Sequence, residues 1–127
     1  MYIEFNPNPC GRRVGDCAVR ALAKALDITW ESAFMKLALN GLQMCDMPSS
    51  DSVLGSVLRQ NGFERKALSN SYPEDYTAEE FCKEYPIGTH VLFFGGHVAC
   101  VDSGNLYDAW DSSQEFIQYF WSKEGTV

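Results

Sequence analysis

The sequence predicts an α+β fold in which N-terminal helices pack on a C-terminal antiparallel β-sheet. Apolar residues at helical spacing occupy the first half of the chain, whereas glycine-bounded runs rich in Val, Phe and Tyr occupy the second half. A chain of 127 residues, of which 46% are hydrophobic, is long enough to bury one core. Since no linker or repeat interrupts it, residues 1–127 are expected to form a single domain.

The first two helices follow an extended arm and loop over residues 1–15. Asp16 is a suitable N-cap for a helix over residues 17–26. A second helix is expected to begin after Thr29 and to end near Asn40-Gly41, because glycine readily adopts the left-handed conformation that ends a helix. Its expected buried stripe comprises Trp30, Phe34, Leu37 and Ala38.

A third helix is predicted over residues 51–60, where Asn61-Gly62 would end it. A short strand over 63–68 and a polar connector over 69–75 should follow. Thr77 then starts a short helix that runs to Tyr85, with Glu80 at the position that completes a capping box.

The remaining residues are expected to build the sheet. A strand over 90–94 precedes a hairpin whose arms are residues 97–101 and 105–111, joined by a turn at Ser103-Gly104. The aromatic run over 115–121 predicts a final strand.

Two residues in this framework have the chemistry of a thiol catalyst. Cys17 follows Gly15 at the expected start of a helix, where unpaired N–H groups and the helix dipole stabilise a thiolate. His97 follows a double glycine at the start of a strand, where an imidazole can accept the thiol proton and later donate it to a leaving group. His90 is a weaker candidate, since it occupies an ordinary position at a strand start.

A carboxylate on the return strand would orient His97, and two residues compete for this role. A four-residue loop, 101–104, would place Asp108 directly across from His97, whereas a three-residue loop, 103–105, would place Asp111 there. The sequence leaves this register open.

An oxyanion intermediate needs two hydrogen-bond donors. The backbone N–H of Cys17 would be one of them. Asn8 is the candidate for the second, and Asn6 is the other amide available in the arm. Arg12 and Arg13 are alternative sources of charge near a substrate carboxylate.

The composition of the chain excludes several classes of protein function. A net charge of −7 argues against nucleic acid as a partner, because phosphate recognition needs clustered Lys and Arg. No apolar run is long enough to span a membrane, and the first residues do not resemble a secretion signal. Five cysteines without a CxxC pair, together with only two histidines, favour a cytoplasmic protein with no metal and no cofactor.

The segments Gly15-Asp16-Cys17, Gly96-His97-Val98-Ala99 and 106–111 resemble the papain-like cysteine peptidase superfamily. The chain is most similar to its small bacterial and phage members of the bacteriocin-leader-peptidase and transglutaminase-like types. The resemblance implies a papain-like fold with Cys17 as nucleophile, His97 as general base and acid, and Asp108 as the orienting residue. A glutamine usually precedes the nucleophile in that superfamily, and Gly11 stands near its place here.

The expected function is therefore a cysteine peptidase or amidase that cleaves a peptide or protein substrate through a thioester intermediate. A transferase outcome, in which an amine replaces water, remains open. The alternative is a catalytically inactive papain-like interaction protein, such as a phage accessory protein. A thiol redox protein is a weaker reading, because Cys10 could pair with Cys17 only if the arm folds back. The oligomeric state stays open.

Overall fold

A computed structural model describes residues 1–68 and 75–123, and within these ranges it contains four helices and six strands. The helices are α1 (Cys17–Leu26), α2 (Trp30–Met44), α3 (Asp51–Gln60) and α4 (Ala78–Glu84). The strands are β1 (Tyr2–Glu4), β2 (Phe63–Ala67), β3 (Thr89–Phe93), β4 (Val98–Asp102), β5 (Asn105–Asp108) and β6 (Tyr119–Lys123).

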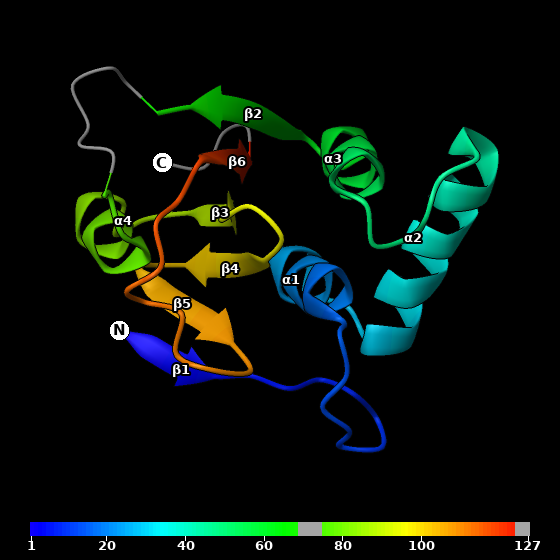
Figure 1. Cartoon of the computed structure of the whole chain (residues 1–127), viewed down its shortest axis with the longest axis horizontal. Helices are drawn as coiled ribbons and strands as arrows, with labels where there is room; N and C mark the ends of the chain where they lie inside the picture. The colour runs from blue at the N-terminus through cyan, green and yellow to red at the C-terminus, as the bar shows by residue number, and fades with distance from the viewer. Residues whose placement is uncertain (69–74, 124–127) are drawn as a thin grey trace.

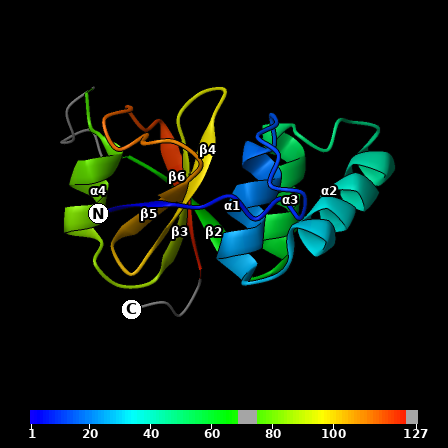
Figure 2. The same cartoon turned by 90° about the horizontal axis from the view of Figure 1, so that it is seen from below.

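The six strands form one sheet in the order β1-β5-β4-β3-β6-β2. Helices α1 and α3 cover one face of the sheet, α2 lies outside them, and α4 covers the opposite face (Figures 1 and 2). The predicted α+β class is thereby confirmed at the level of helices packed on a largely antiparallel sheet. None of the described helices is both long enough and apolar enough to cross a bilayer.

Each face of the sheet has its own hydrophobic core, because successive residues of a strand point to opposite faces. In β3, Val91 and Phe93 pack with α1, α2 and α3, whereas Leu92 packs with α4. The strands in the middle of the sheet are therefore apolar on both faces, which explains the nearly continuous buried run of β3 and β4.

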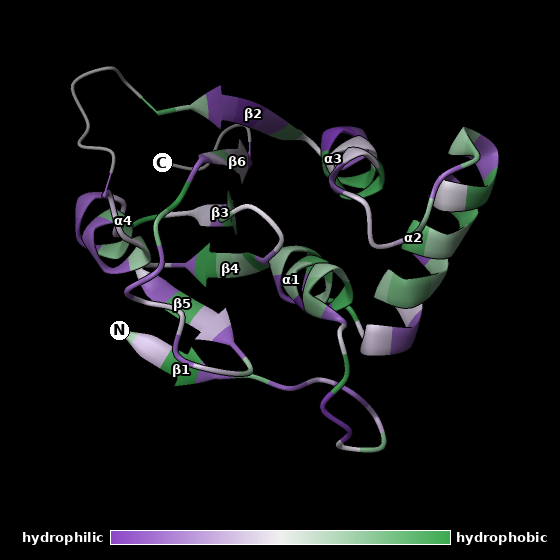
Figure 3. Ribbon diagram, viewed as in Figure 1, coloured by the Kyte–Doolittle hydropathy of each residue, from purple (hydrophilic) through white to green (hydrophobic). Residues whose placement is uncertain are grey.

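Strand β2 lies at one edge of the sheet and is coloured hydrophilic over most of its length in Figure 3. Of its residues only Phe63 is buried, and the next three are charged and exposed. Charged side chains on an edge strand discourage pairing with another chain. The strand predicted over 63–68 is confirmed.

Several sequence predictions agree with the structure. Helices α1 and α3 have the predicted bounds, residues 17–26 and 51–60. The short helix α4 begins after Thr77, whose hydroxyl accepts a hydrogen bond from the Glu80 N–H. Of the polar connector predicted over 69–75, residues 69–74 lie outside the described part.

Helix α2 differs from its prediction in length and in its buried face. It continues past Gly41 to Met44, and Cys45 adopts the left-handed conformation with φ 55°. Gly41 lies inside the helix, and its lack of a side chain matters there because a Cβ would stand 2.8 Å from the Asp46 carbonyl oxygen. The buried residues are Ala33, Leu37 and Gly41, whereas the side chain of Phe34 is 43% exposed.

The sheet is mixed rather than purely antiparallel. Residues 2–4 of the predicted arm form β1, which pairs parallel to β5 with Tyr2 opposite Leu106. The final strand begins at Tyr119 instead of residue 115 and inserts between β3 and β2. Both differences involve pairing partners that are distant in sequence, which local residue patterns do not reveal.

Candidate functional site

The turn between β3 and β4 positions His97. Gly95 and Gly96 both have positive φ angles, of 87° and 85°, which glycine adopts without the strain that a Cβ would cause. A Cβ on Gly95 would also stand 2.5 Å from the Gln118 amide nitrogen. The N–H of Phe94 donates to the carbonyl of His97, at 2.9 Å, and this bond closes the turn directly before β4.

The hairpin of β4 and β5 has neither of the two registers considered from the sequence. Its loop consists of Ser103 and Gly104, so that Asp102 pairs with Asn105 and Cys100 with Tyr107. Continuing this register puts Asp108 two residues away from the position opposite His97, a diagonal separation that two polar side chains can bridge.

Asp108, and not Asp111, is the carboxylate that contacts His97. The distance from Asp108 Oδ2 to His97 Nε2 is 2.7 Å. Asp111 is exposed, and its carboxylate instead accepts a hydrogen bond from the Ser113 N–H at 3.0 Å.

The Asp108 carboxylate is buried and accepts further hydrogen bonds besides that from His97. The hydroxyl of Ser112 donates to Oδ2 at 2.6 Å, while Oδ1 accepts from the Ala109 N–H at 2.8 Å and from Arg20 Nη2 at 2.9 Å. Burial alone would raise the pKa of Asp108, but the hydrogen bonds from His97 and Ser112 lower it overall. Asp108 therefore remains a carboxylate near neutral pH.

His97 is a strong base at this position. Burial would lower its pKa, but the hydrogen bonds and negative charges of Asp108 and Cys17 raise the pKa of His97 to about 9. Two aromatic rings contact the imidazole, with ring centroids 5.6 Å away for Phe94 and 4.8 Å away for Trp110. Since Asp108 engages Nε2, Nδ1 is the ring nitrogen left for the interaction with Cys17.

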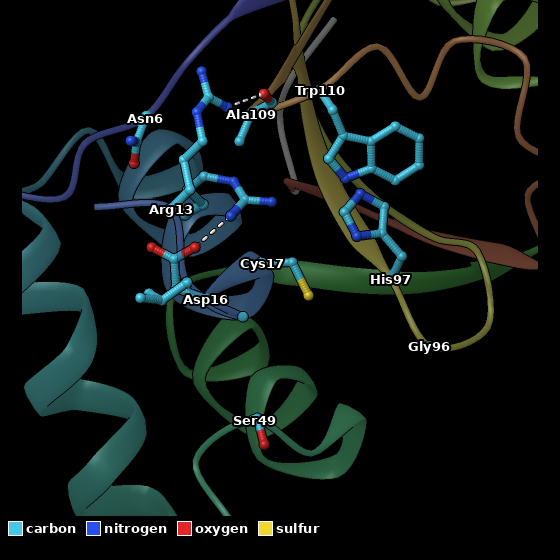
Figure 4. A pocket seen from close by; sticks show the side chains of 12 residues that line it. Asn6, Arg13, Asp16, Cys17, Ser49, Gly96, His97, Ala109 and Trp110 are labelled. Carbon is cyan, nitrogen blue, oxygen red and sulfur yellow. Dashed lines mark hydrogen bonds and ion pairs between the residues drawn. The ribbon is translucent and has the colours of Figure 1, made fainter. Parts of the chain in front are cut away.

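Cys17 is the first residue of α1, and its half-buried side chain lies beside that of His97 in the cleft (Figure 4). Burial would raise the pKa of the thiol, but hydrogen bonds from the His97 side chain and the Val98 N–H lower it. A low thiol pKa beside a high imidazole pKa favours a thiolate–imidazolium pair.

Asp16 occupies the N-cap position of α1, as the sequence predicts, but without the usual side-chain bond. Its side chain makes no cap hydrogen bond. One carboxylate oxygen forms an ion pair with Arg20, and the other accepts from the indole N–H of Trp30 at 2.8 Å. The first N–H groups of α1 are therefore not occupied by this carboxylate.

Arg20 is the residue of this candidate site that the sequence reasoning missed. It is buried, and its guanidinium joins the carboxylates of Asp16 and Asp108. A continuous polar chain thus runs from Trp30 through Asp16, Arg20 and Asp108 to His97. The spacing of Asp16 and Arg20 by four residues was the available signal, because such residues are neighbours on a helix.

The thiol and the imidazole open into a cleft of about 680 Å³. Its other walls come from the arm, the start of α1, the α2–α3 loop and the end of β5, and Figure 4 labels Asn6, Arg13, Asp16, Ser49, Gly96, Ala109 and Trp110 among its lining residues. Arg13 is fixed across it by a 2.7 Å hydrogen bond to the Ala109 carbonyl.

The two amides considered as oxyanion donors are placed differently. Asn8 does not line the cleft, and its side-chain oxygen accepts from the N–H groups of Cys10 and Arg12 in the arm. Asn6 does line the cleft, but its amide nitrogen donates to the carbonyls of Gly11 and Arg12. Both side chains thus stabilise the arm in this structure.

The remaining cysteines and the second histidine lie apart from this cleft. All five cysteines are free thiols, with Cys82 and Cys100 buried and Cys10 and Cys45 exposed. His90 is buried in the sheet. Within residues 1–68 and 75–123, no group of three or more His, Cys, Asp or Glu side chains is arranged to hold a metal ion. Comparisons of the chain with protein-family models, with curated proteins and with solved structures found no match.

Proposed function

We propose that the protein is a papain-like thiol hydrolase that cleaves a peptide or other amide through a thioester intermediate. The observation that carries this proposal is that Cys17 and His97 line one open cleft, while the buried Asp108 carboxylate contacts His97. Each group has a role in such chemistry: a thiolate attacks, an imidazolium donates a proton, and a buried carboxylate fixes the imidazole.

In the proposed first step, Cys17 Sγ attacks the carbonyl carbon of the substrate amide. The negative charge that forms on the carbonyl oxygen is stabilised by the Cys17 N–H at the start of α1. The tetrahedral intermediate then collapses as the C–N bond breaks, and His97 gives its Nδ1 proton to the departing amine. The product of this step is a thioester on Cys17.

In the second step, neutral His97 removes a proton from water, and the resulting hydroxide attacks the thioester carbonyl. The C–S bond breaks, the acid leaves, and Cys17 and His97 return to the thiolate–imidazolium pair. An amine in place of water would make the same cycle a transfer reaction. The net charge of −7 favours neutral or basic peptides as substrates.

The proposal can be tested by iodoacetamide labelling over a range of pH, read separately for each cysteine by peptide mass spectrometry. Because the pKa of Cys17 is lowered by His97, alkylation of Cys17 should persist to lower pH than is usual for a thiol and exceed that of Cys10, an exposed thiol in the same chain. His97→Ala should abolish this advantage. If Cys17 is labelled slowly, and at the same rate in the wild type and in His97→Ala, the hydrolase proposal fails and a binding protein is the better interpretation.

A further inference from the structure

A second cavity, of about 330 Å³, adjoins the cleft on the helical side of the molecule. Its walls are mostly apolar and come from α1, α2 and the α2–α3 loop: Ala18, Val19, Trp30, Phe34 and Pro48. The two cavities share Val14, Gly15, Asp16 and Ser49 along their border. Since Cys17 lines the cleft while its neighbours Asp16 and Ala18 line this cavity, the nucleophile stands at the junction.

An aromatic wall of the cavity is left open to solvent. Phe34 stacks on Trp30, with ring centroids 5.3 Å apart, yet 43% of Phe34 is exposed. Removing such a surface from water is favourable, by about 25 cal/mol for each Å² of apolar area buried. A ligand that extends from the cleft over this wall would gain that free energy.

No unpaired charge of the described residues faces the cavity. Asp16 is the single ionisable residue in its lining, and both of its carboxylate oxygens are engaged, by Arg20 and by Trp30. A charged side chain placed here would lose water without gaining a partner, which is costly. The bond from Trp30 to Asp16 also fixes the wall relative to the residue that precedes the nucleophile.

We propose that this cavity binds an apolar side chain, aromatic or branched aliphatic, of the substrate residue next to the scissile amide. The inference rests on the proposed function, because it takes Cys17 as the nucleophile. It adds a substrate class: peptides in which a large apolar residue adjoins the bond that is cut.

The test compares two alkylating probes, iodoacetamide and N-phenethyl iodoacetamide. In both reactions the Cys17 thiolate displaces iodide and forms a thioether, so that the probes differ only in the apolar group. We expect the rate ratio of the phenethyl probe to iodoacetamide to be at least about tenfold higher at Cys17 than at exposed Cys10, the range that apolar pockets give for such groups. Equal ratios at the two thiols would overturn the inference.

Phe34→Glu places a charge on the cavity wall and should bring the Cys17 ratio close to that of Cys10. Met35→Glu is the matched control, because Met35 is on the same helix, is 56% exposed and lines neither cavity. It should keep the wild-type ratio. If the rate ratio at Cys17 keeps its wild-type value in Phe34→Glu, the inference is also overturned.

The same labelling separates this inference from the proposed function. If His97→Ala slows Cys17 alkylation but the phenethyl preference is absent, the hydrolase proposal stands and the subsite fails. If the preference is present but His97→Ala has no effect, the proposed function fails, and with it the assignment of the cavity to a substrate.

Discussion

The chain has two histidines, and their surroundings differ sharply. His90, in β3, is buried among aromatic rings, and its two ring nitrogens contact the Ser122 hydroxyl at 2.7 Å and the Ile87 carbonyl at 3.0 Å. Burial lowers the pKa of His90. His97 lies one hairpin turn away along the chain, and its pKa is raised to about 9.

The difference shows that the charge of the partner, more than the depth of burial, determines the protonation of each imidazole. Burial opposes the charged form in both cases. A hydroxyl and a carbonyl satisfy the hydrogen bonds of His90 without compensating a positive charge. A buried carboxylate does compensate it at His97, and Arg20 in turn compensates the neighbouring carboxylates. The network of ionised side chains ends at His97 in the cleft, whereas the uncharged groups around His90 belong to the core.

The largest effect is expected from Arg20→Met, which should lower the free energy of unfolding by removing the cation shared by the network around His97. The substitution would leave Asp16 and Asp108 buried without their shared cation, and breaking a buried ion pair in this way costs about 3–5 kcal/mol of unfolding free energy. Lys24→Met is the control, since Lys24 lies on the same helix and is 3.9 Å from a half-exposed Asp102; its cost should stay below about 1 kcal/mol. Urea unfolding measures both. If the two substitutions lowered the unfolding free energy equally, the buried ion pairs of Arg20 would contribute no more to stability than an exposed pair.

The second-largest effect is expected from Asp108→Asn, which should slow the alkylation of the Cys17 thiol. Without the carboxylate, the pKa of His97 should fall toward its ordinary range, and fewer molecules would hold the thiolate–imidazolium pair. We expect Cys17 alkylation at pH 7 to slow by on the order of tenfold. Asp111→Asn, at an exposed carboxylate on the same segment, should leave the rate unchanged. If both variants react like the wild type, Asp108 does not control His97.

The smallest effect is expected from Ser122→Ala at the other histidine. The substitution removes the hydroxyl that contacts His90 Nδ1, and an unsatisfied buried nitrogen costs about 1 kcal/mol. Thermal unfolding should register this loss, while the pH profile of Cys17 alkylation should not move. A change in that profile would mean that the two histidines are coupled.

The sequence predicted the parts of the molecule that are encoded locally. The apolar period after Asp16 gave the bounds of α1 and with them the place of Cys17 at a helix N-terminus. The turn residues Ser103-Gly104 indicated the hairpin that holds Asp108. Its register was not predictable, because one residue more or less in the loop changes every cross-strand pair.

Long-range contacts explain the remaining misses. The pairing of β1 with β5 joins residues about a hundred positions apart, and no local pattern announces it. Arg20 lies within an apolar run, where its burial depends on Asp108 in a distant strand. Phe34 fits the helical apolar period but faces a cavity, since Ala33 and Leu37 provide the buried face of α2.

The most direct test of the account is an NMR titration of the two imidazole rings in the wild-type chain, with His90→Gln used to assign the signals. Because Asp108 and Cys17 favour the charged form of His97, we expect its ring to stay protonated through neutral pH and to lose its proton near pH 9. The midpoint of the His90 titration should lie below pH 6.5, since burial lowers its pKa. Titration of His97 at or below pH 6.5 would contradict the ion pair on which the proposed chemistry depends.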